Sequence, residues 1–168
     1  MGVTLPAASS AGGEQPKFLT ETTAPDGGHQ HLIVKFSPPR GTPFGERWHD
    51  LLHLEHLALA VLADNGVAVA PSRIVQSGER TYLVSERFDR VGMHGKRHVV
   101  PASAAHDAFV TAPLPTLVQP AGYAALAAQT RTWAITYWER AACLPALSPA
   151  LRAASADNAR RLQESNKT

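Results

Sequence analysis

The pattern of apolar and polar positions predicts a small antiparallel sheet in the first third of the chain. In residues 31–36 (HLIVKF) the even positions are apolar and form one face of a strand, whereas Lys35 points to the other face. A further strand is expected to begin at Lys17 and run through Thr20, and Asp26-Gly27-Gly28 between the two is a turn signal. The two strands and their turn therefore predict a hairpin with a longer loop.

A helix is predicted for residues 45–64. Apolar side chains recur there at helical spacing and form one stripe: Trp48, Leu52, Leu59 and Leu62. Glu55 falls on the same stripe, and a glutamate on an apolar face is costly unless it finds a cationic partner. Gly66 suits the left-handed conformation that commonly ends a helix.

The rest of the chain divides into a strand-rich segment and an Ala/Pro-rich segment. Strands are expected at residues 73–76 and 81–88, and a further hairpin turns at 92–95 and returns along 96–100. Beyond residue 110, alanine supplies 15 of the last 58 residues and prolines interrupt repeatedly, with helices expected near 123–142 and 149–164. The fold class expected is α+β, with a sheet-and-helix domain at 1–110 and an Ala/Pro-rich helical tail at 111–168.

Composition excludes several classes of protein. Apolar residues make up 44% of the 168 residues, which predicts a folded chain, and the net charge of +2 without a long basic block does not indicate nucleic-acid binding. No apolar run approaches the roughly 20 residues that span a membrane. The single cysteine, Cys143, rules out an internal disulfide and fits a reducing, cytoplasmic location; its apolar neighbours predict a buried thiol.

A glycine-rich segment before the first strand is a candidate phosphate-binding loop. Gly12 and Gly13 allow backbone N–H groups to approach a phosphate closely, although Pro16 removes one donor. The segment is not a P-loop, because no Gly-Lys-Ser/Thr leads into a helix. On its own it also fits a flexible N-terminal arm.

Lys35 and Glu55 are each an unusual charge in an apolar setting, and each explains the other. The lysine lies in an apolar strand and the glutamate on an apolar helix stripe, so the two are expected to pair. The alternatives are a purely structural ion pair, or a Lys35 that points outward from an edge strand.

The segment Glu86-Arg87-Phe88 ends the last long strand of the sheet. Such a junction can offer a backbone carbonyl to an adenine amino group and a backbone N–H to a ring nitrogen. Asp89 and Arg90, which follow, are typical of a solvated turn. His49, His53 and His56 share one helix face, but no cysteine is near, so we interpret them as a solvated face rather than as a metal site.

In this order the three segments resemble the HipA family of bacterial serine/threonine kinases, the toxin half of a toxin–antitoxin pair. The resemblance covers roughly residues 5–110 and implies the N-terminal ATP-binding part of the kinase. It implies a kinase-like small lobe that binds ATP and Mg²⁺, a protein substrate, and a helix-turn-helix antitoxin as partner. By this resemblance Gly12, Gly13, Gln15 and Lys17 would cover the phosphates, Lys35 (held by Glu55) would pair with them, and Glu86, Arg87 and Phe88 would hold the base.

The catalytic half of such a kinase is not evident in the sequence. After Asp107 the only acidic residues are Glu139, Asp157 and Glu164, and none lies in an Asp-x-x-x-x-Asn setting. We therefore assign no catalytic residue and no metal ligand, and expect a truncated, catalytically incomplete kinase. A frame disruption near codon 111 and a small lobe retained for another purpose both fit this pattern. A non-catalytic module that binds an antitoxin-like partner, and a remnant that folds poorly, are the alternatives.

Overall fold

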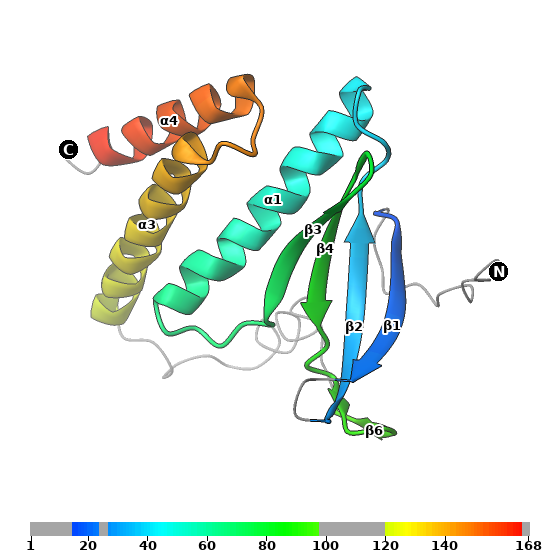
Figure 1. The fold of residues 1–168 in the computed structure, drawn as a ribbon. Coiled ribbons are helices and arrows are strands. Elements are labelled where there is room, and N and C mark those ends of the chain that lie inside the picture. The colour runs from blue at the N-terminus through cyan, green and yellow to red at the C-terminus, as the bar shows by residue number, and fades with distance from the viewer. Residues whose placement is uncertain (1–14, 24–26, 98–119, 166–168) are drawn as a thin grey trace, which may run out of the picture.

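The α+β class is confirmed by a computed structural model, which describes residues 15–23, 27–97 and 120–165 (Figure 1). The main sheet contains four strands, and a short hairpin follows it. The strands are β1 (Lys17–Thr23), β2 (His29–Phe36), β3 (Ser72–Ser77), β4 (Arg80–Glu86), β5 (Arg90–Val91) and β6 (Gly95–Lys96). The helices are α1 (Pro43–Asp64), α3 (Pro120–Cys143) and α4 (Pro149–Glu164).

The sheet is antiparallel throughout, with the strand order β1-β2-β4-β3. The alternation predicted in β2 is confirmed, because Leu32 and Val34 are buried together with Val84 of β4 in one apolar cluster. Phe18 and Tyr82 pack against this cluster. These side chains share one face of the sheet, so the opposite face carries Lys35 and its neighbours in register.

Helix α1 covers the face of the sheet that carries Lys35. Leu52 of α1 and Leu83 of β4 are both fully buried, as expected where a helix packs on a sheet. The helix begins where Thr42 accepts a hydrogen bond from the Gly45 N–H, and it ends before Gly66, whose φ of 78° is the left-handed geometry predicted for it.

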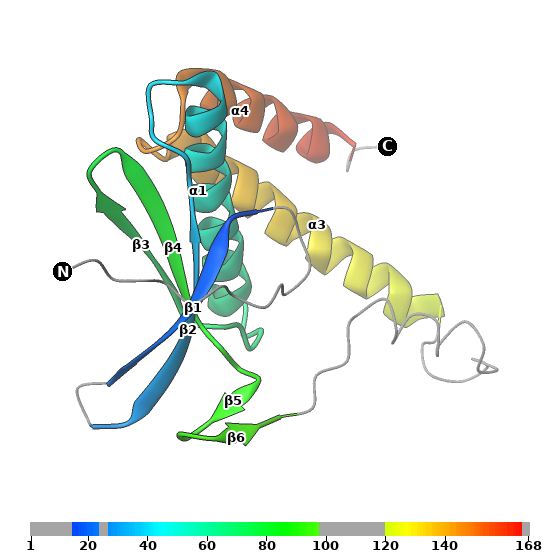
Figure 2. The ribbon, with the colours of Figure 1, turned by 90° about the vertical axis from the view of Figure 1, so that its right-hand side faces the viewer.

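The helical tail packs on α1. In Figures 1 and 2, α1 lies between the sheet and the α3–α4 pair, and α3 contacts both α1 and α4. Two residues of α1 hold the turn between α3 and α4. Asp50 accepts hydrogen bonds from the Ser148 N–H at 3.0 Å and the Ser148 hydroxyl at 2.6 Å. His49 Nε2 lies 2.9 Å from the Ala146 carbonyl.

Two predictions about burial were wrong. His49 and His53 are not solvated but buried, at 1% and 8% exposure, because the α1 face that carries them is covered by the sheet and by the α3–α4 turn. Cys143 is exposed, because it is the last residue of α3 and its apolar neighbours do not cover it. Within the described residues, no helix combines the length and apolarity that a membrane span requires.

Candidate functional site

Lys35 and Glu55 meet between the sheet and the helix. The Lys35 ammonium donates a hydrogen bond to the Glu55 carboxylate, which joins β2 to α1. Both side chains remain partly accessible, at 27% and 37% exposure. A pair of this kind can hold the lysine head in one position while leaving a side of it open to an anion.

Lys17 lies directly opposite Lys35 in the β1–β2 register, so the two lysines project from the same face of the sheet. Like charges in directly opposed positions repel each other, and an anion between them would relieve that repulsion. Gln15 precedes β1 and is partly buried. Gly12 and Gly13, predicted to cover phosphates, lie outside the described residues.

At the end of β4, the Glu86 backbone carbonyl receives no ladder hydrogen bond from the residue opposite it. The Glu86 N–H donates to the Pro71 carbonyl at 2.9 Å, and in an antiparallel ladder the partner would return a hydrogen bond to the Glu86 carbonyl. Pro71 has no N–H and cannot return it. The Arg87 N–H is committed to the His31 carbonyl at 2.8 Å. The next residue, Phe88, is 63% exposed and makes no hydrogen bond with its N–H among the described residues.

Asp89 fixes the segment that follows the strand. Its carboxylate takes two hydrogen bonds from the Arg87 guanidinium, one of them at 2.8 Å from Nε, and lies 3.6 Å from Arg90 Nε. The hydrogen bond from Arg87 lowers the pKa of Asp89, and the same bond raises the pKa of Arg87. The pair is partly buried, so it is more than the solvated turn that the sequence indicated.

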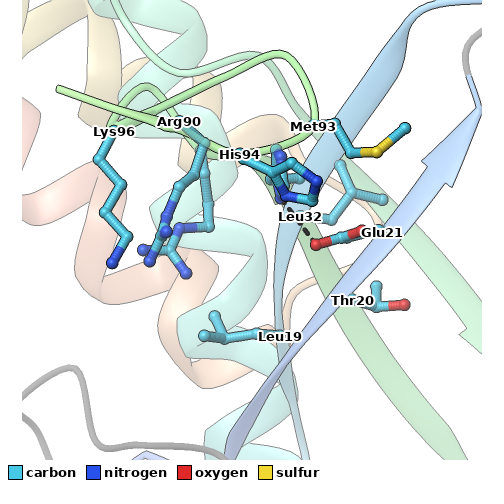
Figure 3. Close-up of a pocket in the computed structure, with 10 residues that line it drawn as sticks. Leu19, Thr20, Glu21, Leu32, Arg90, Met93, His94 and Lys96 are labelled. Carbon is cyan, nitrogen blue, oxygen red and sulfur yellow. Dashed lines mark ion pairs between the residues drawn. The ribbon is translucent and has the colours of Figure 1, made fainter.

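A hollow of about 360 Å³ lies beside this segment, between β1–β2 and the β5–β6 hairpin (Figure 3). His31 joins the two sides, because Nδ1 lies 3.1 Å from the Glu21 carboxylate and Nε2 lies 2.7 Å from the Gly92 carbonyl. The residues that line the hollow are Leu19, Thr20, Glu21, His31, Leu32, Arg87, Arg90, Met93, His94 and Lys96.

Sequence reasoning missed this hollow except at Arg87. Its other residues come from two hairpins, and no local pattern reveals that β5–β6 folds back beside β1–β2. The single available signal was the concentration of basic residues after the strand, from Arg87 to Lys96.

The three histidines of α1 have separate structural surroundings. His49 Nδ1 lies 2.5 Å from the Thr81 hydroxyl, and His56 Nδ1 lies 2.9 Å from the Ser72 hydroxyl. A carbonyl only accepts hydrogen bonds, so His49 donates from Nε2 to Ala146 and accepts at Nδ1 from Thr81. In the described part of the chain, no group of three or more His, Cys, Asp or Glu side chains is placed to hold a metal ion.

Comparison with known proteins identifies the family. A family model described as "HipA-like C-terminal domain" matches residues 9–144, which include the candidate residues and the whole of α3. Toxin YjjJ of Escherichia coli (strain K12) is 40% identical over 106 residues, which cover 62% of this chain and 24% of that protein. The chain thus spans about a quarter of the length of this relative. No solved structure gives a significant match.

The family match extends over more than half of the chain, and it includes the three segments on which the sequence resemblance rests. This chain therefore belongs to the HipA-like family, as predicted, whereas its assignment to the N-terminal part of such a kinase stays a prediction.

Proposed function

We propose that the sheet and α1 form the ATP-binding part of a HipA-like serine/threonine protein kinase. The observation that carries this proposal is the Lys35–Glu55 pair between β2 and α1. Kinases hold the nucleotide phosphates with a strand lysine, which a glutamate of the neighbouring helix keeps in place. Each of the two residues stands out in the sequence as a charge in an apolar setting, and their contact is the arrangement that this role requires.

Lys17 adds a second cation for the phosphates. Its position opposite Lys35 places two ammonium groups on one face of the sheet, which suits the several negative charges of a nucleotide. By the family resemblance, Gln15, Gly12 and Gly13, which precede β1 in the sequence, would cover the phosphates. Lys17 and Lys35 would thus bind the phosphates, and Glu55 would orient Lys35.

The adenine base would lie at the end of β4. The Glu86 carbonyl, to which Pro71 returns no hydrogen bond, would accept from the adenine amino group, and the Phe88 N–H would donate to a ring nitrogen. The Arg87 N–H is already used by His31. This assignment uses backbone groups, so the side chains of the three residues would contribute little to base recognition.

Phosphoryl transfer needs an aspartate beside the attacking hydroxyl and further groups that hold Mg²⁺. We assign no residue of this chain to these roles, so we expect these residues to bind nucleotide without transferring the phosphoryl group themselves. In a complete kinase the acceptor would be a protein hydroxyl, and the neutralising partner a helix-turn-helix antitoxin.

The proposal is tested by thermal unfolding of the purified chain with and without Mg-ATP. Binding to the folded state stabilises it by about 2.7 kcal/mol when the ligand is at 100 times its Kd. We expect a clear upward shift of Tm for the wild type and none for Lys35→Met. The control is Arg160→Met on α4, where an exposed cation pairs with Asp157 of the same helix.

An unchanged ATP response in Lys35→Met would remove Lys35 from the site. If the wild type shows no response to ATP and instead captures a helix-turn-helix protein when no ATP is present, the chain is a non-catalytic interaction module.

A further inference from the structure

Two cationic side chains project from the β5–β6 hairpin into the hollow described above. Arg90 and Lys96 are register partners across the hairpin, so they share one face of it. Figure 3 shows their side chains side by side, extending toward Leu19 of β1. Two neighbouring cations aimed at the same space are the arrangement that binds an anion.

The carboxylates near the hollow do not neutralise it. Glu21 lines it and contacts His31, whereas Asp89 accepts two hydrogen bonds from Arg87 and also lies 3.6 Å from Arg90 Nε. Lys96 has no carboxylate partner among the described residues. Three cationic side chains, Arg87, Arg90 and Lys96, stand against two carboxylates, Glu21 and the adjacent Asp89, so the surroundings of the hollow keep an excess of one positive charge.

The hollow is separated from the proposed phosphate position. His31 and Lys35 are four residues apart on β2, which corresponds to roughly 13 Å along the strand. Glu21 lies opposite His31 in the register, just as Lys17 lies opposite Lys35. Phosphates at Lys17 and Lys35 would therefore lie away from the hollow, whereas a base at Glu86 would lie next to it, beside Leu32 and Arg87.

The walls of the hollow are mixed in character. Leu19 and Met93 lie on opposite sides of the space, and Met93 is 54% exposed at the tip of the hairpin. An apolar wall beside cationic groups suits a ligand with a carbon stem and a charged end, as in a glutamate side chain. The Arg87–Asp89 pair shows that this segment already binds a carboxylate in a two-point geometry.

We propose that the hollow between β1–β2 and β5–β6 binds an acidic peptide segment, with Arg90 and Lys96 contacting its carboxylates. One element of this inference, that the peptide belongs to the protein that is phosphorylated, rests on the proposed kinase function. The binding of an acidic peptide follows from the hollow itself.

The test is fluorescence anisotropy with a labelled peptide of four glutamates around one serine, using the full chain. We expect the Arg90→Gln/Lys96→Gln double variant to bind at least tenfold more weakly than the wild type, and each single variant several-fold more weakly. The control is Arg160→Gln/Arg161→Gln, which removes two exposed cations from α4. The peptide with glutamines in place of glutamates should not bind, and added salt should weaken binding.

A second measurement separates a carboxylate source from a phosphate source. Inorganic phosphate and a phosphoserine form of the glutamine peptide are added as competitors. We expect weak competition from both, and displacement of the acidic peptide by low concentrations of either would replace the proposal with a phosphate site.

The Mg-ATP thermal shift distinguishes this inference from the proposed function. We expect the Arg90→Gln/Lys96→Gln variant to retain its response to Mg-ATP, and Lys35→Met to retain peptide binding. Loss of the ATP response in the double variant would assign the hollow to the nucleotide site and overturn the proposal, as would a wild type that does not bind the peptide. If the peptide binds but ATP does not, the kinase assignment fails while the peptide site stands.

Discussion

Lys17 and Lys35 face each other across β1 and β2, and Glu55 of α1 contacts Lys35. The register therefore places two cations on the same side of the sheet, with the Glu55 carboxylate between strand and helix. The two like charges repel each other, so a further anion that binds between them is favourable. This relationship makes one prediction for stability and another for nucleotide binding.

We expect Lys17→Gln to change the stability of the nucleotide-free chain by less than about 1 kcal/mol, the upper size of one cross-strand pair. The same change should reduce the Mg-ATP-induced shift of Tm, because it removes a cation from the phosphate position. Chemical denaturation measures the first effect and thermal unfolding with nucleotide the second. A larger loss of stability together with an unchanged ATP response would contradict the assignment of Lys17.

The Lys35–Glu55 contact should be measurable as a coupling energy. A double-mutant cycle built from Lys35→Met, Glu55→Gln and their combination removes each partner separately and then both. Because both side chains are partly accessible, we expect a coupling of only about 0.5–1 kcal/mol in urea unfolding. The pair Arg160–Asp157 on α4 is the control and should give less, since both of its side chains are mostly exposed. Strictly additive effects of Lys35→Met and Glu55→Gln would show that the contact contributes nothing.

His53 should make the stability of the chain sensitive to mild acid. Burial, with the nearby His49 and His56 as smaller causes, lowers the pKa of His53 from 6.5 to about 4. The unfolded chain therefore binds a proton at His53 between pH 6.5 and 4 while the folded chain does not. Stability from this group is fully present above pH 6.5, falls as the pH drops toward 4, and changes no further below that value.

The size of this loss should be about 3 kcal/mol, since each pKa unit corresponds to about 1.4 kcal/mol. We expect His53→Leu to reduce the slope of stability against pH in this window, measured by urea unfolding at several pH values. The variant also removes Nε2 of His53, which is buried without a hydrogen-bond partner. His29→Gln, at an exposed position of β2, is the control and should leave the slope unchanged.

The sequence predicted the elements well where one periodic pattern covers a whole element. The alternation in β2 and the stripe on α1 each determine which side chains face the protein, so the pairing of Lys35 with Glu55 could be predicted from the two patterns together. The turn residue Gly66 also has the left-handed geometry expected of it. In these places local propensity and tertiary packing require the same arrangement.

Where a second layer covers an element, the pattern misled. His49 and His53 look like a polar face in the sequence, but α1 is covered on that side by Thr81 of the sheet and by the turn at Ala146. The hollow beside β5–β6 was missed for a related reason, because it depends on how two hairpins meet. Sequence periodicity describes one element at a time and cannot report such contacts.

Asp50 should determine whether the helical tail stays attached to the sheet and α1. Its carboxylate accepts two hydrogen bonds from Ser148, and Ser148 in turn caps the first turn of α4 by accepting from the Leu151 N–H. Asp50 itself is 8% exposed and the two Ser148 donors are partly buried, so its loss would leave them without this acceptor. We expect Asp50→Ala to cost about 1–3 kcal/mol in urea unfolding, a typical penalty for a buried donor left unsatisfied.

Limited proteolysis should show where that loss acts. If Asp50 anchors the tail, Asp50→Ala will be cleaved faster than the wild type within residues 144–149, while β1 to β4 keep their protection in hydrogen exchange. Asp157→Ala on the exposed face of α4 is the control, and it should change neither stability nor cleavage. A uniform loss of protection in both parts would mean that the α3–α4 pair and the sheet unfold as one unit. In that case the helical tail is an integral layer of the fold, and a boundary near residue 110 has no thermodynamic meaning.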